Sequence, residues 1–337
     1  MIVVAGESLV DLLVRHDGSV SATPGGGPFN VARALGRLGQ PVAFLGRLSS
    51  DPFGRILRSR LVADGVDLGL APTTDDPTLL AVADIDVDGS ATYRFHAAGS
   101  AAVGLSPGDV ANGLPAGTTA LHVGTLGLAL EPMASTIAGL VAAAPAHVLV
   151  MVDPNCRPSA IEDPAAYRRR LAGLMGRVDV VKLSTDDLAW LDFGRDAVGA
   201  SRAILAAGPA VLLLTDGGRP TRIVTPRDLV AVDVPEVTVV DTVGAGDAFG
   251  AGFLAAWTRA GRGQAELADL DAVSEATRFA VEVGARTASR AGADPPSLAE
   301  LSRSVAGRTA RDGSQPLTSV PRGAEPGATE PGAAEPG

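Results

Sequence analysis

The sequence has few of the residues that define several common protein classes. It contains one cysteine, Cys156, so an internal disulfide is impossible and a reducing compartment is expected. Aromatic residues make up only 4%, so the interior must be built mainly from Ala, Val and Leu. Lysine and arginine (28) are outnumbered by aspartate and glutamate (38), which argues against a broad nucleic-acid surface. The N-terminus, MIVVAGESLVDLLV, lacks a signal-peptide pattern, and no apolar run is long enough to span a bilayer. We therefore expect a cytoplasmic protein without a membrane partner.

The chain does contain many short apolar runs, which alternate with amphipathic stretches. The runs predict buried strands at residues 2–5, 42–45, 120–123, 148–152, 178–183 and 211–215. The stretches between them predict helices at residues 30–38, 52–63, 132–143, 164–175, 185–191 and 197–207. Strands that alternate with helices indicate βαβ units, so we expect an α/β fold with a mostly parallel sheet.

Two predicted hairpins interrupt this alternation. Their turns are Asp17-Gly18 and Asp88-Gly89, a dipeptide that favours the positive φ angles of a tight hairpin. The flanking apolar segments are residues 12–14, 20–22, 79–87 and 92–95. Two hairpins within an α/β chain predict a small β-sheet beside the main domain, which could act as a lid, an oligomer interface or both.

The C-terminal segment differs in composition from the rest of the chain. Residues 307–337 end in an irregular Glu-Pro-Gly repeat and have almost no apolar side chains to bury. This composition predicts a disordered tail after a single domain of residues 1–306, whose folded part ends near Leu301.

The most informative stretch is VVDTVGAGDAF, residues 239–249, followed by GAGFLAAW. A Gly-Ala-Gly turn leads directly into an Ala-rich helix, so the free N–H groups of the first helical turn can bind an anion. Asp247 lies at this turn, where a carboxylate can accept the proton of an attacking hydroxyl during phosphoryl transfer. The alternative is that Asp247 only complements the helix N-terminus. For an isolated turn we would favour that alternative, and the full stretch favours catalysis.

DTVGAGDAFGAGF resembles the C-terminal signature of the ribokinase-like (PfkB) carbohydrate kinases. GGGPFNVA, which begins at Gly25, resembles the glycine-rich N-terminal signature of the same family, and the likeness covers nearly all of residues 1–300. The resemblance implies a three-layer α/β/α sandwich with a mostly parallel sheet, and a lid formed by hairpins within residues 9–24 and 78–98. It also implies that Asp247 is the catalytic base and that Gly244, Ala245 and Gly246 form the anion hole. A Walker A sequence is absent, so this turn would hold the phosphate.

The resemblance also implies a set of substrate-binding residues: Asp11, Gly25, Gly26, Asn30 and Arg157. Asp11 would bind sugar hydroxyls, although it could simply be a solvated residue at a strand end. Asn30 offers a donor and an acceptor, with a plain helix N-cap as the alternative. Arg157 follows Asp153-Pro154-Asn155 and could hold a phosphate or carboxylate, or pair with a surface acid.

The nucleotide and its metal are assigned by the same resemblance. The nucleotide-binding residues would be Ser184, Thr215, Gly217, Gly218, Thr242 and Gly246. Ser184 and Asp187 replace the family's Asn-x-x-Glu element, so Asp187 would contact Mg²⁺ through water; alternatively the two residues only cap a helix. Residues 285–293 resemble the segment that closes over adenine and allow a K⁺ site of backbone carbonyls, which leave no trace in composition.

These observations predict an ATP- and Mg²⁺-dependent sugar kinase. The segments GESLVDLL, GGGPFN, YRFHAAGSA and DPNCRP resemble fructokinases most, with 2-keto-3-deoxygluconate kinase, ribokinase and nucleoside kinase as alternatives. A non-catalytic sugar or nucleotide sensor on the same fold is a further alternative, which has no need of a base at Asp247. The lid sheet could pair two copies as a homodimer.

Overall fold

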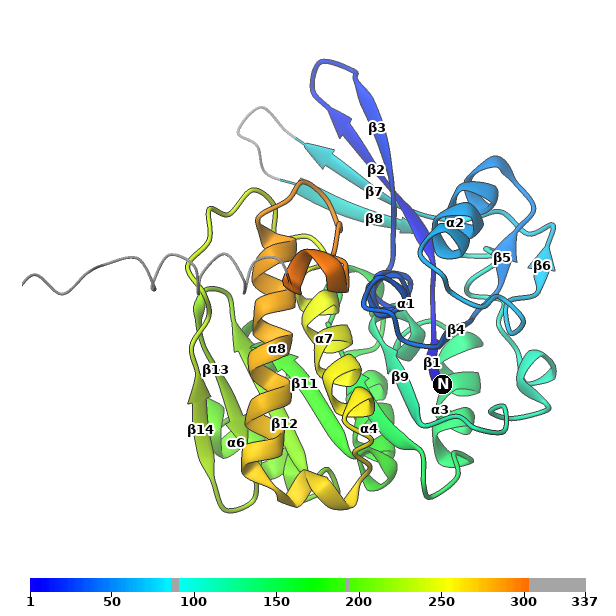
Figure 1. Ribbon diagram of the computed structural model, residues 1–337. Coiled ribbons are helices and arrows are strands. Elements are labelled where there is room, and N and C mark those ends of the chain that lie inside the picture. The colour runs from blue at the N-terminus through cyan, green and yellow to red at the C-terminus, as the bar shows by residue number, and fades with distance from the viewer. Residues whose placement is uncertain (86–90, 192–193, 303–337) are drawn as a thin grey trace, which may run out of the picture. The chain divides into compact units, whose positions relative to one another are not determined.

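The main sheet of the computed structural model has eight strands in the order β14-β13-β12-β11-β10-β9-β1-β4 (Figure 1). The structure describes residues 1–85, 91–191 and 194–302. The strands are β1 (Ile2–Ala5), β4 (Val42–Leu45), β9 (Ala120–Gly124), β10 (Leu149–Asp153), β11 (Val180–Ser184), β12 (Val211–Asp216), β13 (Arg219–Val224) and β14 (Leu229–Val232). Neighbours from β4 to β12 pair in parallel, and only β12-β13 and β13-β14 are antiparallel. The prediction of an α/β fold with a mostly parallel sheet is confirmed.

Helices cover both faces of this sheet (Figure 1). The helices are α1 (Gly27–Arg37), α2 (Pro52–Ala63), α3 (Met133–Ala142), α4 (Pro164–Leu174), α5 (Thr185–Leu191), α6 (Ala197–Leu205), α7 (Ala245–Arg259) and α8 (Leu270–Ala288), of which α2 lies to one side, next to α1. Helices α1, α7 and α8 pack together on one face, and α3 to α6 lie on the other. Several starts are set by local sequence. Asp51, for example, caps α2 by accepting from Gly54 N at 2.7 Å, and Pro52 supplies the first-turn φ angle.

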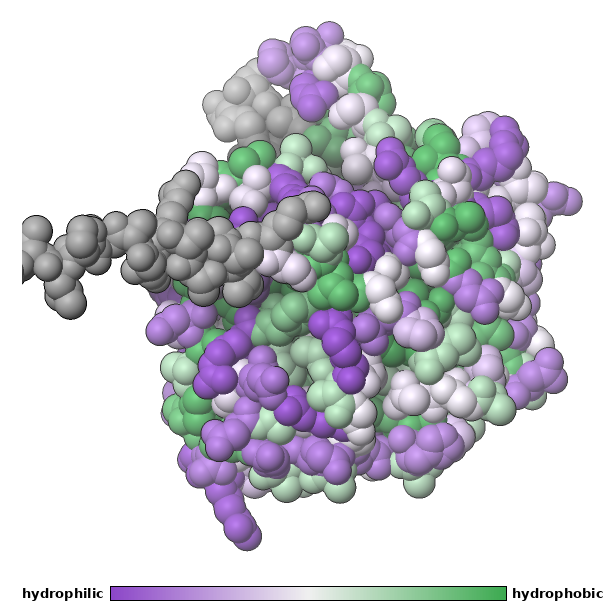
Figure 2. Space-filling model, viewed as in Figure 1, coloured by the Kyte–Doolittle hydropathy of each residue, from purple (hydrophilic) through white to green (hydrophobic). Residues whose placement is uncertain are grey.

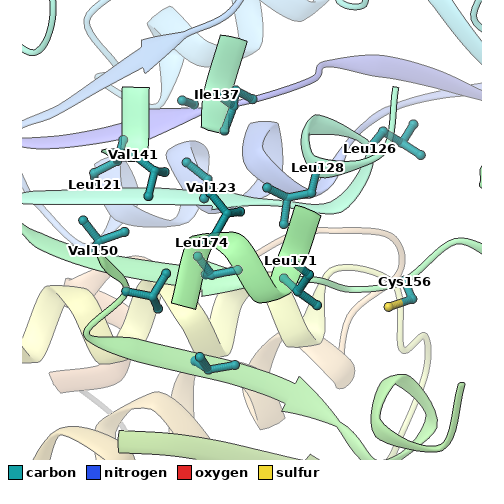
Figure 3. Close-up of a cluster of buried hydrophobic side chains, with 14 of the residues drawn as sticks. Leu121, Val123, Leu126, Leu128, Ile137, Val141, Val150, Cys156, Leu171 and Leu174 are labelled. Atoms are coloured by element: carbon teal, nitrogen blue, oxygen red, sulfur yellow. The ribbon is translucent and has the colours of Figure 1, made fainter. Parts of the chain in front are cut away.

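The core under α3 and α4 consists almost entirely of aliphatic side chains (Figure 3). Leu121 and Val123 of β9 point into it, whereas His122 between them points to α7, next to Gly250. This alternation follows from the two-residue period of a strand. Because both faces of the sheet are covered, its parallel strands are mainly apolar runs, and that is why the sequence predicted them; β13 and β14 at the antiparallel end are partly exposed.

A second sheet of four strands has the order β3-β2-β7-β8. It consists of β2 (Leu9–Arg15), β3 (Val20–Gly25), β7 (Leu79–Ile85) and β8 (Ala91–His96), and a two-stranded sheet pairs β5 (Leu48–Ser49) with β6 (Thr73–Thr74). The strand pairs β2-β3 and β7-β8 are antiparallel, as the hairpin prediction required, and β2 joins β7 in parallel. The turn at Asp17-Gly18 is described, whereas Asp88-Gly89 lies outside the described residues. The predicted tail, 307–337, also lies outside them.

Residues 1–298 form one compact unit, to which everything described below belongs. Three parts of it were not predicted from the sequence: the β5-β6 pair, the β13-β14 hairpin and α8. Helix α1 begins at Gly27, three residues before its predicted start, so Asn30 lies in its first turn and the N-cap alternative for Asn30 is wrong.

Across the face of the molecule that carries α7 and α8, hydrophilic residues are interspersed with hydrophobic ones (Figure 2). Within the described residues, no helix has the length and apolar character needed to cross a bilayer.

Candidate active site

Two cavities meet where the parallel strands end. The first, of about 850 Å³, lies between the second sheet and the start of α7. The second, of about 960 Å³, lies beyond the ends of β11 and β12. Both are lined by Asn155, Arg157, Pro158, Thr242 and Gly246. The carboxyl ends of parallel strands are where α/β sheets place ligands, so this junction is the candidate active site.

Asp247 lies in the first turn of α7, lines the first cavity and is only 7% exposed. Its Oδ2 atom accepts a hydrogen bond from Asn30 Nδ2 at 2.9 Å, and its Oδ1 atom accepts one from Asn155 Nδ2 at 3.4 Å. Both partners come from distant segments rather than from the amides of α7, which speaks against a simple capping role. Burial raises the pKa of Asp247 above its ordinary value, and the bond from Asn30 opposes the shift.

The conformation of the turn before Asp247 depends on Gly244 and Asp241. Gly244 has the left-handed φ of 75°, and a Cβ atom there would lie 2.6 Å from the Cβ atom of Ala293. Asp241 braces the turn, because its carboxylate accepts from Val243 N at 3.0 Å and from Gly292 N at 2.9 Å. Helix α7 therefore starts with its N–H groups and the positive end of its dipole at the junction of the cavities.

The predicted substrate-binding residues lie around the first cavity, with one exception. Asp11, Gly26, Asn30 and Arg157 line it. Gly25 does not; a Cβ atom at this position would lie 2.3 Å from Asp11 Oδ2, so this glycine leaves room for the carboxylate. Burial raises the pKa of Asp11 to about 6; the charge of Arg157 opposes this shift and the charge of Asp247 adds to it.

Arg157 is exposed and lies at the junction of the cavities. Its Nη1 atom donates to Asn155 Oδ1 at 2.7 Å and to the carbonyl oxygens of Asn155 and Cys156 at 3.1 Å. Asn155 has an uncommon positive φ of 38°, and its amide links Arg157 to Asp247. Strained backbone of this kind gathers at functional sites, and Asn155 was not singled out by the sequence.

The predicted nucleotide-binding residues all lie on the second cavity: Ser184, Thr215, Gly217, Gly218, Thr242 and Gly246. Ala245 of the turn lines it as well. Asp187 is buried, and its Oδ2 atom accepts from Ser184 N at 3.0 Å and from Ser184 Oγ at 2.6 Å, while its Oδ1 atom accepts from Cys156 N at 2.6 Å. Ser184 Oγ accepts in turn from Asp187 N at 3.0 Å, so the two residues form a capping box at the start of α5.

Three buried ionisable side chains beside the site were not predicted from the sequence: Glu7 and the pair Lys182 and Asp153. Glu7 is fully buried and its carboxylate accepts from Gly27 N at 3.2 Å and from Gly127 N at 3.0 Å. Burial raises its pKa to about 7. Lys182 of β11 donates to Asp153 Oδ2 of β10 at 2.8 Å, and both side chains are almost fully buried. The one sequence signal for this pair is that each charged residue adjoins an apolar run that predicts a buried strand.

This arrangement has the parts that phosphoryl transfer to a hydroxyl needs. A carboxylate with a raised pKa can accept a proton, a helix start beside it can hold a phosphoryl group, and two cavities meet at that point. The fold and the site together define a small-molecule kinase.

Comparison with known proteins identifies the family. The family model for pfkB family carbohydrate kinases matches residues 1–300. A fructokinase from Rhizobium leguminosarum bv. trifolii is 36% identical over 259 residues, which are 76% of this chain and 79% of that protein. The solved structure of a fructokinase with bound ATP from Xylella fastidiosa superposes with a TM-score of 0.83 at 27% identity, over 91% of this chain and 98% of that one. An aminoimidazole riboside kinase from Salmonella enterica, complexed with aminoimidazole riboside and an ATP analogue, gives a TM-score of 0.75 at 27% identity, over 87% and 94%.

The chain therefore belongs to the pfkB family of carbohydrate kinases, as its two signatures indicated. It is an ATP-dependent sugar kinase with the ribokinase-like fold.

Proposed function

We propose that the protein is a fructokinase, which transfers the γ-phosphoryl group of ATP to a hydroxyl of fructose with Asp247 as general base. One observation carries this proposal: Asp247 lies at the junction of two cavities, each of its oxygens hydrogen-bonded by an asparagine from a distant segment. The identity to fructokinases supports the choice of sugar. The chain is also 27% identical to a riboside kinase of known structure, so the choice of fructose needs a direct test.

In the proposed reaction, the sugar occupies the first cavity with Asp11, Gly26 and Asn30 at its hydroxyls. Asp247 accepts the proton of the attacking hydroxyl as its oxygen bonds to the γ-phosphorus, and the bond from that phosphorus to the bridging oxygen breaks, so that ADP leaves. The backbone N–H groups of Gly244, Ala245 and Gly246 stabilise the charge on the transferred group. ATP occupies the second cavity, with its phosphates toward Arg157.

Magnesium is proposed to arrive with ATP. In the part of the chain that the structure describes, no three His, Cys, Asp or Glu side chains are grouped as a metal site. This fits a cation that is held mainly by phosphate oxygens and water, which is usual for Mg²⁺. Asp153 Oδ1 is a buried carboxylate oxygen without a hydrogen-bond partner, and it could take a metal-bound water, as could Asp187. When bound, Mg²⁺ neutralises phosphate charge; the K⁺ site at residues 285–293 stays a prediction.

Two further assignments are proposals about organisation. Residues 1–306 would form the kinase domain, with the second sheet as its lid and 307–337 as a tail outside it; the family match to residues 1–300 supports this division. The second sheet is also proposed to pair two copies, because β3 is an edge strand and its Val20 is 61% exposed.

The substrate is tested by ADP release with Mg-ATP across D-fructose, D-tagatose, D-ribose, 2-keto-3-deoxygluconate, adenosine and aminoimidazole riboside. We expect the highest kcat/KM for D-fructose, with the turnover of the Asp247→Asn variant lowered at least about 100-fold. A higher kcat/KM for a riboside would replace fructose by a nucleoside as the substrate. If no compound of the panel stimulated ADP release while ATP binding was intact, the result would favour the non-catalytic sugar or nucleotide sensor.

The pKa of Asp11 predicts a pH-dependent KM for the sugar. Its carboxylate must be ionised to accept two sugar hydroxyls, and with a pKa of about 6 it becomes protonated as the pH falls. Between about pH 7.5 and pH 5 we expect the KM to rise by about tenfold, the loss of the ionised fraction over this range. The Asp11→Asn variant should have a high KM that does not change over the same range. A wild-type KM that is constant down to pH 5 would contradict the role of Asp11.

A further inference from the structure

Lys182 is the only lysine in the chain, and every other residue among the 28 lysines and arginines is an arginine. It is 3% exposed, in the middle of β11, and lines the second cavity. A buried ammonium is costly unless it is paired, and Asp153 pairs with it. The guanidinium of an arginine is a wider, planar fork, whereas the ammonium of a lysine is a compact point charge. The single lysine thus lies at a buried position beside Asp153, where a compact positive charge fits.

Besides Asp153, the ammonium lies against the turn at the start of α7. A Cβ atom built on Gly246 would lie 2.9 Å from Lys182 Nζ. Gly246 is not among the glycines with positive φ, so its backbone conformation does not require glycine. The missing side chain instead leaves space through which the ammonium reaches the turn. Its charge is therefore placed directly beside the N–H groups that are proposed to hold the γ-phosphoryl group.

The charge balance around the second cavity also singles out Lys182. Of the described residues that line this cavity, only Arg157 and Lys182 are cationic. Arg157 is exposed and its guanidinium bonds to Asn155 and Cys156, whereas Lys182 is fixed in the wall. Burial alone would lower the pKa of Lys182, but the carboxylates around it, Asp153 first, raise it above its ordinary value. The ammonium is thus charged at neutral pH.

We propose that Lys182 binds the γ-phosphoryl group of ATP, with Asp153 holding its ammonium in place beneath the Gly244–Gly246 turn. An ammonium has three N–H donors, and Asp153 Oδ2 takes only one of them. The other two can donate to phosphoryl oxygens, where negative charge is held during transfer. This inference rests on the proposed position of the phosphoryl group at the turn, but not on Asp247 acting as a base.

The single lysine makes a direct spectroscopic test possible. Full-length protein produced with lysine that is ¹³C-labelled at Cε gives one side-chain signal, that of Lys182. A non-hydrolysable ATP analogue with Mg²⁺ should shift this signal, and AMP at saturation should leave it almost unchanged. An equal shift with AMP, or no shift with the ATP analogue, overturns the proposal.

Binding measurements on a paired variant test the same proposal energetically. The Asp153→Asn/Lys182→Met variant removes both charges together, so neither is left buried and unpaired. Measured without Mg²⁺, so that a metal-bound water on Asp153 plays no part, its affinity for the ATP analogue should fall by about 10- to 100-fold, the usual effect of one charge-assisted hydrogen bond. AMP affinity, the internal control, should change by less than about twofold if the adenine site is intact. Equal losses for both ligands would indicate a structural role only, and an unchanged affinity for the ATP analogue would also contradict the proposal.

The Asp247→Asn variant separates this inference from the proposed function. It should bind the ATP analogue normally and show the same shift of the Lys182 signal, while its turnover is lost. Retained turnover in Asp247→Asn would refute the base and leave the Lys182 result valid. A missing Lys182 shift would refute the inference and leave the base assignment valid.

Discussion

The Asp247→Asn variant should lose kcat by about 10²- to 10⁴-fold, the range that a general base contributes. An asparagine has the same size, and its single carbonyl oxygen can still accept from Asn30 Nδ2, so only the long bond from Asn155 Nδ2 is lost. Because burial disfavours the charged form of Asp247, an uncharged amide should leave the melting temperature unchanged or raise it. Steady-state kinetics, ATP-analogue binding and thermal unfolding together measure these outcomes.

The matched control for this variant is Asp269→Asn. Asp269 is a true helix cap, whose carboxylate accepts from Asp271 N at 3.0 Å and from Ala272 N at 3.1 Å at the start of α8. Asparagine is as good a cap as aspartate, so we expect normal kcat from this variant. If the kinetics of Asp247→Asn were as close to wild type as those of Asp269→Asn, Asp247 would only complement the N-terminus of its helix and would not act as the base.

Most of the fold and the position of the reactive turn could be predicted because they depend on local sequence. Strands such as β10 are continuous apolar runs, and their predicted bounds lie within one or two residues of the observed ones. The Gly-Ala-Gly turn before Asp247 is contiguous in the chain. Helix α8 was not predicted, although Asp271, Glu275 and Arg278 are exposed along one side of it, because only its last turn falls within residues 285–293, the part that resembles a family segment.

The partners of Asp247 could not be predicted because they depend on contacts between distant segments. Asn30 is 217 residues away and Asn155 is 92 residues away, and neither separation leaves a periodic signal. The Lys182–Asp153 pair is hidden for a similar reason. Asp153 ends one strand and Lys182 lies within another, and the two side chains meet only because β10 and β11 are neighbours in the sheet. Gly25 is the reverse case: it belongs to a signature, yet its place in the fold is to make room for Asp11.

A Gly244→Ala substitution should have the second-largest effect on turnover. Two costs combine at this position: alanine must adopt a φ of 75°, and its Cβ atom would lie 2.6 Å from the Cβ atom of Ala293. The first cost is about 1 kcal/mol of stability. The second displaces the turn whose N–H groups are proposed to hold the phosphoryl charge, so kcat should fall by about 10²- to 10³-fold. Steady-state kinetics with saturating ATP and sugar, together with thermal unfolding, measure both effects.

Gly261→Ala provides the control that separates the two costs. Gly261 follows the other end of α7 with a φ of 68°, and a Cβ atom there has nothing within 4 Å. Alanine at this position therefore pays the same backbone strain without any collision, and we expect a similar loss of stability with normal kcat. If Gly244→Ala lost no more turnover than Gly261→Ala, the position of the turn would not matter for phosphoryl transfer. The charge would then have to be held by Lys182, Arg157 and the metal alone.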